Sequence, residues 1–102
     1  MAKELIMARI PTHPGALLRE DILPALKMSV SAAAQELGVS RQMLHKILAE
    51  KAPVTPEMAV RLGKFVGDGP DIWVRMQAAH DVAKASIAMA DEIKKIKTAR
   101  AA

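Results

Sequence analysis

The chain of 102 residues contains no cysteine and no tyrosine, and Phe65 and Trp73 are its only phenylalanine and tryptophan. The absence of cysteine excludes disulfide frameworks, thiol nucleophiles and cysteine-ligated zinc. Ala, Leu, Ile and Met supply most of the remaining apolar residues, a composition that favours helices over sheets. We therefore expect an all-α fold, and the length fits a single domain with one modest core.

Long apolar segments are also missing. No run approaches the roughly 18 residues that span a bilayer, and the first ten residues, MAKELIMARI, lack the continuous apolar segment of a signal peptide. We expect a soluble, cytoplasmic protein with no membrane partner. The sequence also lacks a nucleophile–base pair and a phosphate-binding glycine loop. His13, His45 and His80 show no ligand spacing, so we predict no catalytic residue, no metal and no cofactor.

The charge balance is moderately basic, with a formal net charge of +4. A basic excess suits a polyanionic partner but also occurs in ordinary soluble domains, so it does not decide between them. Basic residues accumulate near the C-terminus, where a solvated end and a non-specific phosphate contact are both open. We divide the chain into an N-terminal segment (1–12) that is flexible or orders on a partner, a helical domain (13–88), and a basic helix extension or tail (89–102).

Start and stop signals predict five helices. Ser29, Ser40 and Thr55 are placed to cap helices through their hydroxyl groups, and Gly38 is placed to end one. Prolines suit the first helical position; Pro24, inside the first helix, predicts a break or kink. The buried stripes predicted from helical spacing are Leu17, Leu18, Ile22 and Leu23, then Ala33, Ala34 and Leu37, then Leu44, Ile47 and Leu48, then Met58, Leu62, Phe65 and Val66, and finally Ile72, Trp73, Met76, Ala79, Ala83 and Ile87.

Residues 30–49 carry the most informative spacing. Ala34 is small where two helices would cross, Gly38 makes the turn, and Val39, Leu44 and Ile47 close the inner side. With Ala33 and Leu37, these positions resemble a helix-turn-helix unit, in which the second helix lies in the DNA major groove. A motif that serves only packing is the alternative interpretation.

On the DNA-binding interpretation, the outward side chains of the second helix meet base edges. Arginine and lysine can donate to guanine, and glutamine can pair with adenine. We therefore predict base contacts by Arg41, Gln42 and Lys46, with His45 at the edge of the set. Hydroxyl groups near helix starts and a following lysine can contact phosphates; these predicted phosphate contacts are Ser29, Ser31, Ser40, Lys51 and Thr55.

From His13 to about Asp81, the chain resembles the HigA-type antitoxins among the Xre-like helix-turn-helix transcription regulators. The matching phrases are HPGALLREDIL, SVSAAAQELGVSRQMLHKIL and VTPEMAVRLGKFVGDGPDIWVRMQAAHDV. The resemblance implies a five-helix domain of the Xre or lambda-repressor type and a homodimer. It also implies repression of the protein's own operon at a palindromic double-stranded DNA operator, hence nucleoid association when DNA is bound, and neutralisation of a HigB-type RNase toxin.

Two other function classes stay open: a stand-alone repressor without a toxin, and a helical adaptor that does not bind DNA. The last helix is our candidate for dimer contact through Trp73, Met76 and Ile87, although Trp73 and Met76 on one helical face also fit a core. His80 departs from the family pattern, which often has an aromatic there. The segment from Val82 onward lies outside the resemblance.

Overall fold

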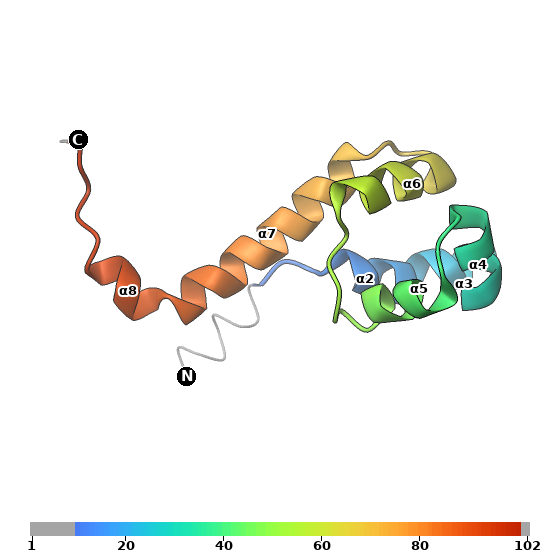
Figure 1. Ribbon diagram of the computed structural model, residues 1–102, viewed down its shortest axis with the longest axis horizontal. Coiled ribbons are helices and arrows are strands. Elements are labelled where there is room, and N and C mark those ends of the chain that lie inside the picture. Colours follow the sequence, from blue (N-terminus) through green and yellow to red (C-terminus); the bar gives the residue numbers. More distant parts are fainter. Residues whose placement is uncertain (1–9, 101–102) are drawn as a thin grey trace.

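The computed structural model describes residues 10–100, and this part of the chain contains helices and no strand (Figure 1). α2 (Pro14–Leu17), η1 (Leu18–Ile22) and α3 (Leu23–Leu26) follow one another as one helical run. The later helices are α4 (Val30–Leu37), α5 (Arg41–Leu48), α6 (Pro56–Val66), α7 (Asp71–Ala88) and the short α8 (Ala90–Lys94). The all-α, five-helix prediction is confirmed, with α8 as an addition. Most of the predicted segment 1–12, namely residues 1–9, lies outside the described residues.

The helix ends follow from the capping residues. Ser29, Ser40 and Thr55 accept hydrogen bonds from backbone N–H groups three residues later, at 3.1, 3.0 and 3.2 Å. These bonds satisfy donors that have no partner inside the helix. Gly38 ends α4 in the left-handed conformation, with φ of 72°, which glycine adopts without a Cβ clash. The predicted caps are confirmed.

The first helical run is irregular where Pro24 enters it. The N–H of Leu23 donates to the carbonyl of Leu18, five residues earlier, which is the hydrogen-bond pattern of a π-helix. Pro24 has no N–H and directly follows this widened turn, so the helical run lacks one donor at this position. The predicted interruption is therefore a widened turn just before the proline, and the chain stays helical through it.

The core is built from the helices up to α6 and from Trp73 of α7, and α8 has no buried residue. Leu18, Leu44, Ile47, Leu62 and Trp73 are each at most 1% exposed. The predicted stripe of α6 needs a correction, because Val66 is 36% exposed and Phe65 is only partly buried. A Cβ on Gly63 would lie 2.3 Å from the carbonyl carbon of Gly69, so the loop after α6 crosses the helix at Gly63, and Val66 is the last residue of α6. The predicted stripe of α7 needs a correction at Ile72, which is 43% exposed.

Trp73 belongs to this core. Its side chain is 0% exposed, and its Nε1 donates a 3.0 Å hydrogen bond to Oδ1 of Asp68. The prediction that Trp73 forms part of a dimer interface is therefore wrong, because the first turns of α7 pack inside the monomer and leave no surface of this residue for a partner. Met76 and Ile87 are partly exposed, and their role in a dimer stays a prediction.

The second half of α7 runs away from the helical body and continues into α8 (Figure 1). We call residues 82–100 the arm. Four of its large apolar side chains are exposed, with Val82 at 64%, Met89 at 45%, Ile93 at 47% and Ile96 at 69%. Of the predicted extension from residue 89, only Ala90–Lys94 is helical within the described residues. No helix between residues 10 and 100 is both long and apolar enough to cross a membrane.

The imidazole rings of His13, just before α2, and His80, on α7, pack against each other. His13 is 4% exposed, and its Nδ1 accepts a 2.9 Å hydrogen bond from the N–H of Gly15. The His80 ring stands edge-on to it, with ring centroids 5.0 Å apart. Nδ1 of His80 lies 2.7 Å from the carbonyl oxygen of Pro11; because a carbonyl can only accept, this nitrogen carries the proton.

We expect this pair to make stability depend on pH. Burial, followed by the nearby charge of His80 and the smaller effect of Lys84, lowers the pKa of His13 below 6.5, while Glu50 and Asp81 oppose the shift. The unfolded chain therefore binds the proton first, and stability falls as pH drops through about 6.5 toward the folded pKa. Thermal unfolding should show a lower Tm at pH 5.5 than at pH 7.5.

Two variants separate His13 from other titrating groups. His13→Asn keeps a capping acceptor but does not titrate, so its Tm should depend less on pH over the same interval. His45→Gln alters an exposed histidine and should retain the dependence of the parent chain. An unchanged pH profile in His13→Asn would contradict the assignment.

Candidate nucleic-acid interface

α5 is amphipathic, and its two faces have different roles. Leu44, Ile47 and Leu48 are buried, as predicted. At 100° per residue, the opposite direction is centred on Gln42 and Lys46, with Arg41 and His45 on one flank. All four of these side chains are exposed. The structure therefore brings the four predicted base-contacting residues onto one outward surface, formed by guanidinium, amide, imidazole and ammonium groups.

The turn before α5 is held from outside the motif. Nη1 of Arg61, on α6, donates to the carbonyl oxygen of Leu37 at 2.8 Å and lies 3.4 Å from that of Gly38. Carbonyls at a helix end have no partner inside the helix, and a cationic donor there is favoured by the helix dipole. Arg61 therefore fixes the turn between α4 and α5. Its partner is 24 positions away, so no local sequence signal reveals it.

A second arginine holds the opposite end of α5. Nη1 of Arg19, on η1, donates a 2.6 Å hydrogen bond to the carbonyl oxygen of Leu48 and lies 3.3 Å from Oε2 of Glu50. Together with the Ser40 cap, this contact supplies partners to main-chain groups at both ends of α5. Sequence reasoning missed Arg19 for the same reason as Arg61, since 29 positions separate it from Leu48.

The predicted phosphate-contacting hydroxyls lie around the start of α5. Nη1 of Arg41 is 3.4 Å from Oγ of Ser31, which places the first turn of α4 beside the first turn of α5. Thr55 shares a small hollow with Met43 of α5, so the start of α6 also borders this surface. Each capping hydroxyl accepts one backbone N–H and keeps its own O–H as a donor, a suitable arrangement for phosphate oxygens.

Two side chains depart from the expected grouping. Lys51 follows the far end of α5 and lines a hollow with Glu50, His80 and Asp81, apart from the hydroxyl groups. Met43 was not predicted, yet it is 45% exposed on the α6 flank of α5 and offers an apolar contact of the kind that suits a thymine methyl. Among residues 10–100, no group of three or more His, Asp or Glu side chains is placed to hold a metal ion.

Comparison with known proteins identifies this arrangement. The helix-turn-helix family model matches residues 18–67, which contain α4, the turn and α5. Virulence-associated protein A of Dichelobacter nodosus is 34% identical over 89 residues, which cover 86% of this chain and 87% of that protein. The chain belongs to the Xre-like helix-turn-helix family. It is thus a DNA-binding regulator, as its motif predicted.

Solved structures of this family place the chain near its antitoxins. Pseudomonas aeruginosa antitoxin HigA with the higBA promoter has a TM-score of 0.83 and 28% identity, covering 89% of this chain and 99% of that chain. Antitoxin GraA in complex with its operator has a TM-score of 0.82 and 34% identity, covering 90% and 93%. Both of these structures are antitoxins solved with DNA, and none of the three relatives is named as an enzyme.

Proposed function

We propose that this Xre-like protein is a transcriptional repressor and the antitoxin of a type II toxin–antitoxin operon of the HigB/HigA kind. As a homodimer, it would bind a palindromic operator in its own promoter and exclude polymerase. It would also neutralise an RNase toxin encoded beside it. The observation that carries the proposal is the outward surface of α5 in a chain similar to antitoxins that were solved with a promoter or an operator.

The chemistry of the surface supports sequence-specific binding. Gln42 and Lys46 project from the outward side of α5, with Arg41 and His45 on one flank, and these side chains would select bases. The hydroxyls of Ser29, Ser31, Ser40 and Thr55 would meet phosphates on both sides of it, and Lys51 would add charge. One such helix covers few base pairs, so a dimer presenting two copies about 34 Å apart is needed for a palindrome.

Substitutions on α5 test the DNA half of the proposal. Arg41→Ala and Gln42→Ala should each weaken binding to the promoter upstream of the gene by about 1–3 kcal/mol and relax selection at one base position. Fluorescence anisotropy with the promoter sequence and with a scrambled duplex measures both effects. Wild-type affinity and selectivity in both variants would exclude α5 as the reading helix.

A lysine variant separates base contacts from phosphate contacts. Lys51→Ala should weaken binding to promoter and scrambled duplex alike and reduce the slope of log affinity against log salt by about one. The readout is a salt titration of both duplexes. A loss confined to the promoter sequence would instead assign Lys51 to base selection.

A stand-alone repressor would have the same α5 surface, so the toxin half needs its own experiment. The gene next to this one should encode a small RNase toxin whose growth arrest is relieved by co-expression of this protein. The two proteins should also co-purify from the co-expressing cells. If no toxin gene lay beside this one, the proposed repressor role would stand and the proposed antitoxin role would be rejected.

A further inference from the structure

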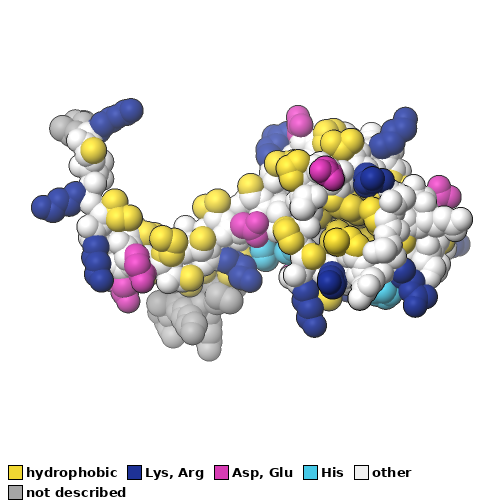
Figure 2. All heavy atoms as spheres, in the orientation of Figure 1, with side chains coloured by type: hydrophobic (Ala, Val, Ile, Leu, Met, Phe, Trp, Pro, Cys, Tyr) yellow, Lys and Arg dark blue, Asp and Glu magenta, His cyan; other side chains and the backbone are white. Residues whose placement is uncertain are grey.

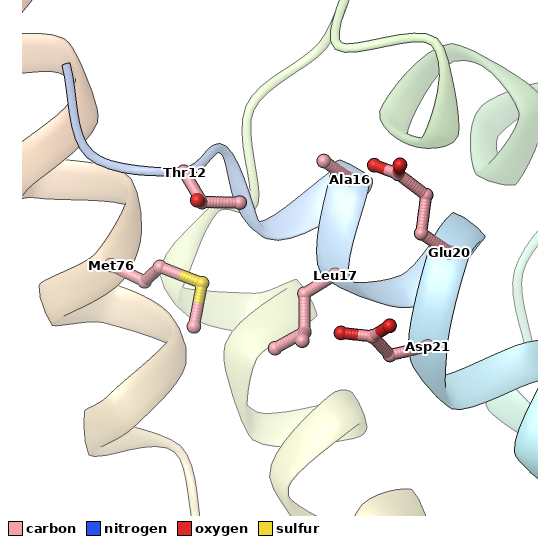
Figure 3. Close-up of a pocket in the computed structure, with 6 residues that line it drawn as sticks. All are labelled: Thr12, Ala16, Leu17, Glu20, Asp21 and Met76. Carbon is pink, nitrogen blue, oxygen red and sulfur yellow. The ribbon is translucent and has the colours of Figure 1, made fainter. Parts of the chain in front are cut away.

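A groove lies between the first helical run and α7, on surfaces that the DNA-binding proposal does not use. Its volume is about 360 Å³, and Ala16, Leu17 and Met76 form its apolar part. Figure 3 shows Met76 on α7 on one side and Leu17 on the first helical run on the other. Thr12 lies at one end and the carboxylates of Glu20 and Asp21 at the other. It is therefore an apolar groove with an acidic rim.

Of the two carboxylates, only that of Glu20 has a partner within the described residues. Glu20 forms an ion pair with Arg19 at 3.0 Å. Asp21 is exposed and forms no ion pair or hydrogen bond within residues 10–100. An exposed carboxylate beside apolar side chains suits a segment that carries both a cationic group and an aliphatic one.

The arm of the same chain has this composition. Its apolar residues Met89 and Ile93 are four positions apart, the spacing of one helical face, and Ile96 follows just past the end of α8; all three are exposed. The neighbouring cations are Lys94, Lys95, Lys97 and Arg100. Figure 2 shows apolar side chains along the arm and basic ones toward its far end. The arm also carries Asp91 and Glu92, so it is the part from Ile93 onward, with Lys94, Lys95, Lys97 and Arg100, that complements the groove in charge and polarity.

The arm does not reach its own groove in the structure. Met76 and Met89 are 13 residues apart on a nearly continuous helix, about 20 Å at 1.5 Å per residue, and the arm points away from the body (Figure 1). In a homodimer, the arm of a second copy of the chain could reach this groove. If two α7 helices pair antiparallel about a two-fold axis at Val82, which is 64% exposed, residue 76 of one chain faces residue 88 of the other.

We propose that the arm of each protomer docks in the acidic-rimmed groove of its partner, with Lys94 and Lys95 at Asp21 and Glu20 and with Met89 and Ile93 on Met76 and Leu17. The contact is reciprocal, as a two-fold dimer requires, and it covers apolar side chains that the monomer leaves in water. This inference rests on the homodimer proposed above and assigns its charged contacts.

Charge reversal tests the electrostatic part of the contact. By sedimentation equilibrium at low salt, Glu20→Lys with Asp21→Lys, or Lys94→Glu with Lys95→Glu, should raise the dimer Kd about tenfold or more. A chain carrying all four changes should recover most of the loss. Glu36→Lys with Glu57→Lys adds the same charge outside the groove and should leave Kd within about twofold. Added salt should reduce these differences, and circular dichroism checks that each variant is folded.

Engineered cysteines test whether the contact joins two chains. Because the protein has no cysteine, Asp21→Cys chains mixed with Lys94→Cys chains should give a disulfide-linked heterodimer under mild oxidation. Glu36→Cys mixed with Lys94→Cys should give much less. A dimer that forms normally but ignores the charge reversals and forms no Asp21→Cys to Lys94→Cys link would overturn this inference alone. A parent chain that is monomeric would overturn the proposed homodimer itself.

Discussion

Gly15→Ala should destabilise the protein by about 3 kcal/mol or more and abolish DNA binding at 37 °C. Gly15 lies in α2, and a Cβ there would be 1.8 Å from the carbonyl oxygen of Ile47 and 2.9 Å from its carbonyl carbon. These are backbone atoms of α5, so relief requires the two helices to separate. Overpacking of this kind costs about 1–3 kcal/mol when side chains can adjust and more when they cannot.

The sign of this effect is diagnostic. Gly15 lies in α2 and does not have a positive φ, so helix propensity alone predicts that alanine would stabilise the protein by about 1 kcal/mol. Gly67→Ala is the matched control, because a Cβ there meets nothing within 4 Å and only the positive φ of 95° is unfavourable; its cost should be about 1–2 kcal/mol. Urea unfolding measures both variants, and a stabilised Gly15→Ala would contradict the close approach of α2 and α5.

Trp73→Ala should cost about 3–5 kcal/mol of folding free energy, the range for a fully buried aromatic residue replaced by alanine. The indole is 0% exposed and packs with the core residues of the other helices. A loss of this size is a large part of the stability of a domain of this length. The variant should therefore be largely unfolded at 37 °C when measured by circular dichroism.

Trp73→Phe separates core packing from dimer contact. Phenylalanine keeps most of the apolar volume but loses the bond from Nε1 to Asp68, so stability should fall by about 1–2 kcal/mol. Its dimer Kd should stay within about twofold of the parent value, because the side chain is enclosed in the monomer. If Trp73→Phe stayed folded but no longer dimerised, Trp73 would have to be part of the dimer interface.

Local signals explain which parts of the fold were predictable. Ser29, Ser40 and Thr55 accept hydrogen bonds from N–H groups three residues later, and Gly38 itself adopts the left-handed conformation. Both signals can therefore be recognised in a short stretch of sequence. The outward position of Arg41, Gln42, His45 and Lys46 follows from the period of one helix. Of the candidate site, the sequence therefore predicted the residues on α5 and the caps beside it.

The parts that were missed depend on separations of many residues. The contacts of Arg19 with Leu48 and of Arg61 with Leu37 join different helices, and the role of Gly15 depends on where α5 passes. Trp73 fits a core or an interface equally well from its spacing, and only the packing of α7 decides between them. Val66 continues the apolar stripe of α6, but it is the last residue of that helix, and its burial depends on what packs beyond the helix end.

The supports of α5 act on main-chain atoms. Ser40 accepts from the N–H of Met43, Arg61 donates to the carbonyl of Leu37, and Arg19 donates to the carbonyl of Leu48. None of these three bonds depends on the side chains at positions 41, 42 or 46. Those three positions can consequently change without loss of these bonds, and a library randomised at positions 41, 42 and 46 should yield DNA-binding proteins of altered sequence specificity from one stable fold.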